Sequence, residues 1–319
     1  MSDNKDFNKF IDRNSNIFVR NLTDIGLCKE TSFKIETNTE SPIMCNPYRQ
    51  PISIINELKK EIEKILEADI IQPGNVGTSA SPAFLIKQKG GSCFIVDYRK
   101  LNALTKPFLH PIPRIDDILD KVSKGKVFSR QDLRKGHFQI PLDEQSRHKT
   151  GFVVPFGIYE FKRVPFGLCN APSFFSRFMF NILGHLDFVQ VYLDDIIIFS
   201  QNGEEHREHL KELFKIVRKN NLKLNGEKCN WLQKSIKILG QLVEGNGIKM
   251  DEEKINAIVD RKPPKNLKEL QSFLGLCNFY SKFVKDFAKK AAPLHNLCKP
   301  DVIFFWNSKC EEAFKQLKE

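Results

Sequence analysis

The sequence predicts an α+β fold, in which a small antiparallel sheet carries carboxylates and helices pack behind it. One observation is the apolar run at 191–199, which two adjacent aspartates interrupt, as is typical of two strands joined by a tight turn. A second is Asp132, an aspartate at the point where another apolar segment gives way to polar residues and a glycine. A third is the set of amphipathic helices between and after these segments. The strand ends are therefore expected to hold acidic side chains.

Length, composition and charge limit the class of protein. The 319 residues are enough for two or three subdomains with a substantial core. Hydrophobic residues make up 41% and charged residues 28%, which argues against wholesale disorder. The 50 Lys and Arg against 39 Asp and Glu give a net charge of +11, which favours a polyanionic partner such as nucleic acid. A well-solvated basic surface explains the same charge, so charge alone does not decide.

The cysteines and the hydropathy pattern indicate an intracellular protein. The 8 cysteines form no Cys-x-x-Cys pair and no zinc-knuckle spacing, so they are expected to be reduced thiols. No run approaches 18 apolar residues, and residues 1–20 are polar and charged, so neither a signal peptide nor a membrane span is expected. His206 and His209 lie among charged residues of an expected helix, and we assign them no role.

The first half of the chain reads as a tether followed by hairpins and helices. Residues 1–50 lack sustained periodicity and predict a leader or tether, with one short strand near 33–36. The elements expected next are an amphipathic helix at 54–66, a hairpin at 83–86 and 94–96, a short helix at 115–122, and a hairpin at 152–154 and 158–161.

The second half is mainly helical around the acidic hairpin. A loop at 164–172 leads into a helix at 173–183, whose N-terminus favours a phosphate or nucleotide nearby. Further helices are expected at 204–220, 251–260 and 267–288.

The three aspartates have a structural and a chemical interpretation. Asp194 and Asp195 suit a turn, and Asp132 suits a helix cap. The turn lacks the usual glycine, however, and the third aspartate lies in a similar setting, which favours a shared site. Three carboxylates from two strand ends can hold two Mg²⁺ ions about 3.5–4 Å apart, an arrangement that serves phosphoryl transfer. Hard oxygen ligands suit Mg²⁺.

Seven short motifs then follow one another in a fixed order. They are VDYRKLN at 96–102, PIPRIDD at 111–117, FSRQDLRKG at 128–136, PFGLCNAP at 165–172, YLDD at 192–195, LGQLVEGNGI at 239–248 and FLGL at 273–276. Over roughly residues 31–319 this order resembles the reverse transcriptases of gypsy-type LTR retrotransposons and retroviruses. The resemblance implies a right-hand polymerase with fingers, a palm made of an antiparallel sheet backed by helices, and a helical thumb or connection.

The resemblance also implies a domain order and a longer parent protein. The expected parts are a leader or tether at 1–50, fingers and palm at 51–245, thumb or connection at 246–296, and the truncated start of an RNase H-like or connection region at 297–319. The chain stops before the carboxylates that an RNase H domain needs, and no protease or integrase signature occurs. The chain therefore resembles a fragment of a Pol polyprotein or a decayed element, expected in the cytoplasm, in a virus-like particle, or in the nucleus.

Site residues carry over from the matching motifs. Asp132, Asp194 and Asp195 resemble the catalytic ligands of two Mg²⁺ ions, for which Mn²⁺ is a possible substitute. Lys228 lies where a general acid could protonate pyrophosphate, and it fits a solvated surface lysine equally well. The remaining positions are nucleotide-binding Leu133, His137, Phe166 and Gly167, and the primer-grip pair Leu239 and Gly240. The backbone carbonyl of Leu133 is expected to assist the metal ligands.

The implied activity is RNA-directed DNA polymerisation, from dNTPs on a primed RNA or DNA template. Two departures oppose it: His137 replaces the family's usual Tyr or Phe, and 91–94 reads Gly-Ser-Cys-Phe where the family has an Arg that binds the triphosphate. The alternative is a catalytically impaired nucleic-acid-binding remnant of a retrotransposon. An RNA-dependent RNA polymerase fits the carboxylates but not the flanking motifs. Oligomeric state cannot be read from these residues.

Overall fold

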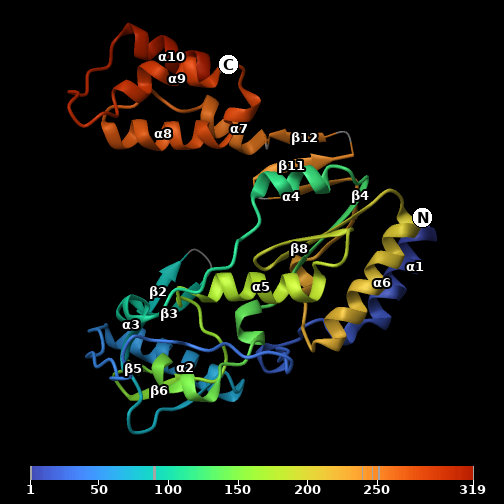
Figure 1. Cartoon of the computed structure of the whole chain (residues 1–319), viewed down its shortest axis with the longest axis vertical. Coiled ribbons are helices and arrows are strands. Elements are labelled where there is room, and N and C mark those ends of the chain that lie inside the picture. The colour runs from blue at the N-terminus through green and yellow to red at the C-terminus, as the bar shows by residue number, and fades with distance from the viewer. Residues whose placement is uncertain (1, 89–90, 239, 246, 251, 319) are drawn as a thin grey trace. The chain divides into compact units, whose positions relative to one another are not determined.

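A computed structural model describes residues 2–88, 91–238, 240–245, 247–250 and 252–318 (Figure 1). The chain divides into two compact units, Met1–Ile236 and Lys237–Glu319. Each unit has its own cluster of buried apolar side chains. Strands and helices alternate irregularly along the chain, so the α+β class that the sequence predicts is confirmed.

A five-stranded sheet in the first unit has the order β1-β6-β5-β2-β3. Its strands are β1 (Ile71–Pro73), β2 (Ser81–Gln88), β3 (Gly91–Val96), β5 (Phe152–Val154) and β6 (Gly157–Phe161). Every pairing is antiparallel except that of β2 with β5. Helix α2 (Ile52–Glu67) buries Leu58, Ile62 and Ile65, one face at helical spacing. The sheet is followed by the short helix α3 (Arg99–Leu104).

A second sheet in the first unit is built around the acidic hairpin. Its order is β7-β8-β4-β9, with β4 (Val127–Asp132), β7 (Val189–Tyr192), β8 (Asp195–Ser200) and β9 (Asn230–Gln233), all antiparallel. Helices α4 (Ile115–Val122), α5 (Ala171–Leu183) and α6 (Gly203–Lys219) contact its strands. Ile196, Ile197 and Ile198 of β8 are all buried, as in a strand covered on both faces. The covered sheet fixes the strand ends on which the aspartates lie.

The N-terminal segment packs against this sheet's helices. Helix α1 (Ser2–Arg13) stacks Phe10 on Phe214 of α6, with ring centroids 5.4 Å apart. Ile17 is buried, and Phe33 forms a single bridge to Leu142 where a short strand was expected. The short 3₁₀ segments of the unit are Ser15–Ile17, Leu22–Asp24, Gly136–Gln139, Glu144–Thr150 and Gly226–Lys228. Large apolar residues on short, irregular elements thus contribute to the core without the periodicity of a long helix.

His206 is buried rather than exposed on the helix surface. Its ring nitrogens lie 2.7 Å from the hydroxyl oxygens of Ser129 on β4 and Ser200 on β8. The Ser129 oxygen also accepts the backbone N–H of Leu232 on β9 at 3.1 Å. His206 therefore connects α6 to β4 and β8, and its expected place among the charged residues of the helix surface was wrong.

The second unit is mainly helical. Its elements are β11 (Gln241–Glu244), β12 (Gly247–Met250), α7 (Glu252–Val259), α8 (Leu267–Phe279), a 3₁₀ turn (Ser281–Phe283), α9 (Phe287–Asn296) and α10 (Ser308–Lys318), with β10 (Ser235–Ile238) at the division between the units. Strands β11 and β12 form an antiparallel hairpin. The helix expected at 267–288 was wrong beyond Phe279, because Val284 is extended and Asp286 has a left-handed φ of 56°. This break lets α9 pack against α8.

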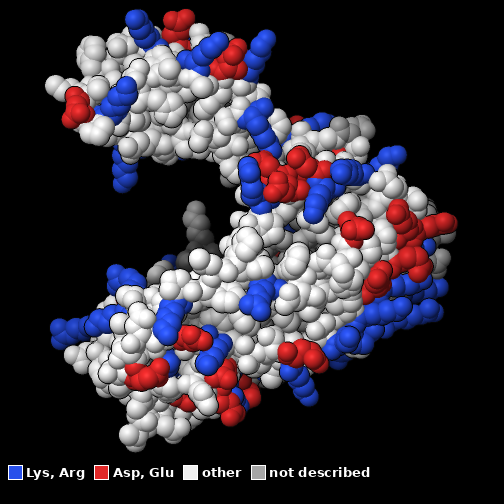
Figure 2. Space-filling view, viewed as in Figure 1, with Lys and Arg blue, Asp and Glu red and all other residues white. Residues whose placement is uncertain are grey.

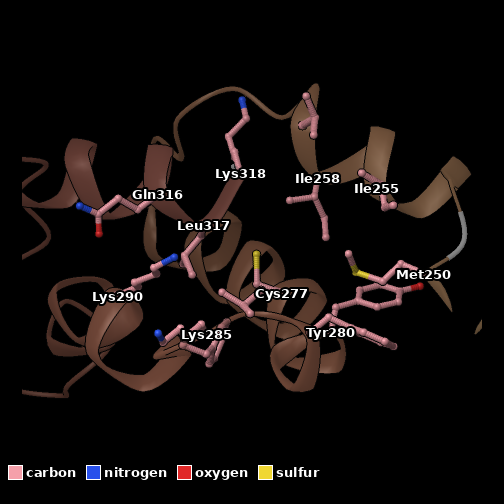
Figure 3. Close-up of a pocket in the computed structure, with 14 residues that line it drawn as sticks. Met250, Ile255, Ile258, Cys277, Tyr280, Lys285, Lys290, Gln316, Leu317 and Lys318 are labelled. Atoms are coloured by element: carbon pink, nitrogen blue, oxygen red, sulfur yellow. The ribbon is translucent and has the colours of Figure 1, made fainter. Parts of the chain in front are cut away.

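The helices of the second unit surround a cavity of about 220 Å³ (Figure 3). Its wall is largely apolar and includes Ile258, Cys277 and Leu317, while Lys285 and Lys290 also line it.

In the part of the chain that the structure describes, no helix is both long and apolar enough to cross a membrane.

Candidate active site

The acidic pair lies at the tip of the β7–β8 hairpin. Tyr192 and Asp195 are cross-strand partners, so Leu193 and Asp194 form a two-residue turn. Leu193 has a φ of 53°, an unfavourable value for a residue with a branched side chain. Such strain is maintained only where the flanking strands determine the turn, as the buried strand β8 does here.

Strand β4 brings the third aspartate to the same place. Asp132 is the direct cross-strand partner of Asp195, and Cα atoms of such partners lie about 4.5–5.5 Å apart. The backbone N–H of Leu133 donates to the carbonyl oxygen of Asp194 at 3.3 Å. The structure therefore brings together all three aspartates that the sequence singled out.

The three carboxylates have different partners. Both oxygens of Asp195 accept hydrogen bonds from Arg130, with Nε–Oδ1 and Nη2–Oδ2 distances of 2.9 Å. Asp132 accepts a bond from the Asn225 side-chain amide at 3.2 Å, and the ammonium of Lys228 lies 3.8 Å away. Oδ1 of Asp194 is buried and has no hydrogen-bond partner. Among the described residues, Asp194 thus has a buried carboxylate oxygen whose hydrogen-bonding capacity is not satisfied.

The charge at the site acts on Asp194. Burial, and then the negative charges of Asp132 and Asp195, raise the pKa of Asp194 to about 6, while Lys228 opposes the shift. A carboxyl group with a pKa raised in this way gains from any cation that approaches it. Repulsion among the carboxylates therefore favours a positively charged ligand.

The donor chemistry of the site fits a divalent cation. Carboxylate oxygens are the ligands that Mg²⁺ and Mn²⁺ prefer, and Oδ1 of Asp194 has no hydrogen-bond partner among the described residues that would compete with a cation. Within the described ranges, no three His, Cys, Asp or Glu side chains are already placed to hold a metal ion. The three aspartates are neighbours in the sheet, and Asp195 forms an ion pair with Arg130.

Two of the positions that the sequence predicts to bind nucleotide, His137 and Phe166, lie in one aromatic cluster. The ring of His137 packs on Phe166 at 4.9 Å and on Phe175 at 5.2 Å between centroids. Burial lowers the pKa of His137 to about 4, so the ring is neutral near pH 7. Phe166 is about half exposed, and Gly167 has a φ of 96° that favours glycine. His137 and Phe166 together present a neutral aromatic surface.

The remaining positions that the sequence singled out are Lys228 in the first unit and the pair Leu239 and Gly240 in the second. Lys228 is in the 3₁₀ turn Gly226–Lys228, with an exposed side chain. Gly240 of the second unit has a φ of 82°, and its carbonyl accepts a hydrogen bond from the Tyr280 hydroxyl at 2.9 Å. Leu239 lies outside the described residues.

Sequence reasoning missed three residues that contact the aspartates. Arg130 precedes Asp132 by two residues and therefore shares its strand face, a signal that alternation in a strand could have supplied. A Cβ on Gly136 would lie 2.6 Å from Oδ1 of Asp194. Asn225 is far from Asp132 in sequence, and no local sequence pattern predicts their contact.

A sheet that carries paired aspartates opposite a third, backed by helices, defines a polymerase palm. Residues 86–243 match the family model described as reverse transcriptase (RNA-dependent DNA polymerase). The chain therefore contains a reverse transcriptase domain at 86–243, as its motifs predicted.

The chain is similar to Pol polyproteins of retrotransposons. It is 39% identical over 282 residues to the retrovirus-related Pol polyprotein from transposon opus of Drosophila melanogaster, a match covering 85% of this chain and 28% of that protein. It is 35% identical over 274 residues to that from transposon gypsy of the same species, covering 83% and 26%. The chain thus spans about a quarter of the length of these relatives.

Solved structures share the fold. The foamy viral protease-reverse transcriptase dRH in complex with double-stranded DNA matches with a TM-score of 0.90 and 23% identity, over 98% of this chain and 56% of that one. The same viral protein in complex with an RNA/DNA hybrid matches with a TM-score of 0.85 and 23% identity, over 98% and 43%. At this identity the similarity shows the fold.

Proposed function

We propose that this chain is an RNA-directed DNA polymerase that extends a primer on an RNA or DNA template. The observation that carries the proposal is the register of the palm sheet, in which Asp132 pairs with Asp195 and Asp194 occupies the adjoining turn. The reverse transcriptase domain at 86–243 supports it. The five-stranded sheet would belong to the fingers, the β7-β8-β4-β9 sheet to the palm, and the second unit to the thumb or connection.

The aspartates would act as ligands. Two Mg²⁺ ions, or Mn²⁺ in their place, would activate the primer 3′-OH and offset the charge of the leaving pyrophosphate. Asp132, Asp194 and Asp195 would supply the oxygens, with help from the backbone carbonyl of Leu133, whose N–H donates to the carbonyl of Asp194. Lys228 is exposed and close to Asp132, so its ammonium is available to donate a proton to pyrophosphate.

The aromatic group would hold the nucleotide. Phe166 and Gly167 would lie against the base and sugar of an incoming dNTP, and the neutral His137 ring would fill the place beside the sugar. Because an imidazole is smaller than the ring of Tyr or Phe, this position would exclude a ribose 2′-OH less completely. Discrimination between dNTPs and rNTPs is therefore the property that we expect to be weakest.

The charge of the chain suits a nucleic-acid partner. Lys and Arg side chains gather along the edge formed by α1 and α6 (Figure 2), where Lys215, Arg218 and Lys219 are exposed. The net charge of +11 favours binding of a polyanion. We infer that a template-primer duplex is the partner, bound in the cytoplasm or nucleus, and that Leu239 and Gly240 contact the primer.

Primer extension tests the proposal. Purified chain would be given RNA or DNA templates with dNTPs or rNTPs, beside Asp194→Asn and a control, Asp187→Asn, that changes an exposed aspartate before β7. We expect extension by the unaltered chain and the control, and its loss in Asp194→Asn with duplex binding retained. Duplex binding without extension by the unaltered chain would instead support the impaired remnant, which the missing arginine at 91–94 favours.

A further inference from the structure

The guanidinium of Arg130 has an unusual place in the palm. Arg130 lies on β4 opposite Ile197, two residues before Asp132, so its side chain emerges on the same face of the sheet as the aspartates. From there it reaches diagonally to Asp195 and donates to both carboxylate oxygens at 2.9 Å. The paired side chains are 36% and 22% exposed, so solvent screens this contact only in part. The contact is a two-point, charge-assisted clamp.

The other two carboxylates are held less firmly. Asp132 receives one hydrogen bond from the neutral amide of Asn225, at 3.2 Å. Asp194 leaves Oδ1 without a partner. Asp195 is thus the one member of the trio, as the structure shows it, with both carboxylate oxygens bonded to a single cationic side chain.

We propose that Arg130 is a positioning residue that fixes the plane of the Asp195 carboxylate and lowers the affinity of the site for divalent cations. This inference rests on the proposed function, because it assumes that Asp132, Asp194 and Asp195 bind the metal. Each carboxylate oxygen keeps a second lone pair, so the clamped Asp195 can still accept a cation. Groups behind metal ligands orient them and adjust their affinity in this way.

The positive charge of Arg130 weakens metal binding, whereas its ordering of the Asp195 carboxylate strengthens metal binding. The larger of the two effects decides whether Arg130 lowers or raises the affinity of the site for the metal. A unit positive charge one carboxylate away from a divalent ion weakens binding about tenfold, even at a near-aqueous dielectric constant. Ordering a short side chain such as aspartate strengthens binding by less than about fivefold. Removing Arg130 is therefore expected to tighten metal binding while the rate of the chemical step falls.

Three variants separate these two effects. Arg130→Gln removes the charge and the clamp, Arg130→Lys keeps the charge but not the two-point geometry, and Arg20→Gln removes an exposed arginine as a control. Mn²⁺ binding would be measured on the full chain without nucleic acid, from the electron paramagnetic resonance signal of free Mn²⁺. Single-turnover primer extension at saturating Mn²⁺ would give the rate.

We expect Arg130→Gln to bind Mn²⁺ several-fold more tightly and to extend at least about tenfold more slowly. Arg130→Lys should bind Mn²⁺ no more tightly than the unaltered chain and extend slowly, and Arg20→Gln should match the unaltered chain in both. Unchanged affinity and rate in Arg130→Gln would overturn the inference alone. If Arg130→Gln does not fold, a normal rate in Arg130→Lys overturns it. Absence of Mn²⁺ binding by the unaltered chain would overturn the proposed function as well.

Discussion

The positions of the three aspartate side chains depend on neighbouring residues that are not acidic. Gly136 is the clearest of these, because a Cβ at its position would lie 2.6 Å from Oδ1 of Asp194 and 2.9 Å from the ring of Phe175. The glycine therefore makes room for the unpartnered carboxylate oxygen. Arg130 and Asn225 hold the other two aspartates. The site is an acidic trio supported by three residues that carry no negative charge.

Replacing Gly136 by alanine should impair catalysis more than folding. The added methyl group would displace the Asp194 side chain, so we expect primer extension to fall at least about tenfold, as small misplacements at reacting groups do. Thermal unfolding should change little if the carboxylate rotates away. Gly275→Ala is the matched control, because its Cβ would meet nothing within 4 Å. Normal extension by Gly136→Ala would show that Asp194 tolerates displacement.

Strand β4 contains a buried glutamine next to Asp132. Gln131 lies just before Asp132, is fully buried, and has no hydrogen-bond partner for either side-chain polar atom. An unsatisfied buried polar group costs about 1–3 kcal/mol of stability. Gln139 is equally buried, but its amide donates to two backbone carbonyls and accepts one N–H. The same residue type thus has opposite effects at two positions.

Leucine substitutions at these glutamines should change stability in opposite directions. We expect Gln131→Leu to raise the free energy of unfolding by about 1–3 kcal/mol, and Gln139→Leu to lower it by at least about 2 kcal/mol, because it leaves buried backbone groups unpaired. Urea denaturation of both variants would measure the two changes. A loss of stability in Gln131→Leu would mean that its amide has a partner in solution.

The His206 network makes the attachment of α6 sensitive to pH. Burial, and then the neighbouring His209, lower the pKa of His206 to about 4, below the value of about 6.5 in an unfolded chain. Between these values the unfolded state binds more protons, so stability falls as the pH is lowered. When the pH is lowered from 7 to 4.5, we expect the free energy of unfolding of His206→Asn to fall by about 2–3 kcal/mol less than that of the unaltered chain. Urea titrations at both pH values would measure this, with exposed His295→Asn as the control.

Local patterns predicted the elements whose periodicity is strong. The apolar run around the aspartates gave β7 and β8, and the helices at 54–66 and 115–122 are present as α2 and α4. The hairpin of β11 and β12 was not expected, because strands of four residues carry little alternation. Contacts such as Arg130 with Asp195 were missed because they join segments that only the folded register brings together. Periodicity reports which face is buried, not which residue lies across from it.

At the scale of the whole molecule, the two units have separate apolar cores. The first contains residues from Phe7 to Leu224 and the second from Ile258 to Leu317. In the second unit, Phe273 of α8 is fully buried against Phe314 of α10, with centroids 4.6 Å apart. Compact units with their own cores commonly unfold with separate free energies.

Phe273→Ala should therefore destabilise the second unit selectively. Loss of the ring is expected to lower the free energy of unfolding of the second unit by about 3–5 kcal/mol, because apolar surface is no longer buried and a cavity is left behind. Hydrogen exchange followed by mass spectrometry should show faster exchange in 267–318 and unchanged protection in β4 and β8, since their amides belong to the other core. Phe279→Ala is the control, because Phe279 lies on the same helix but is 42% exposed. Faster exchange throughout the chain would show that the two cores unfold as one cooperative unit.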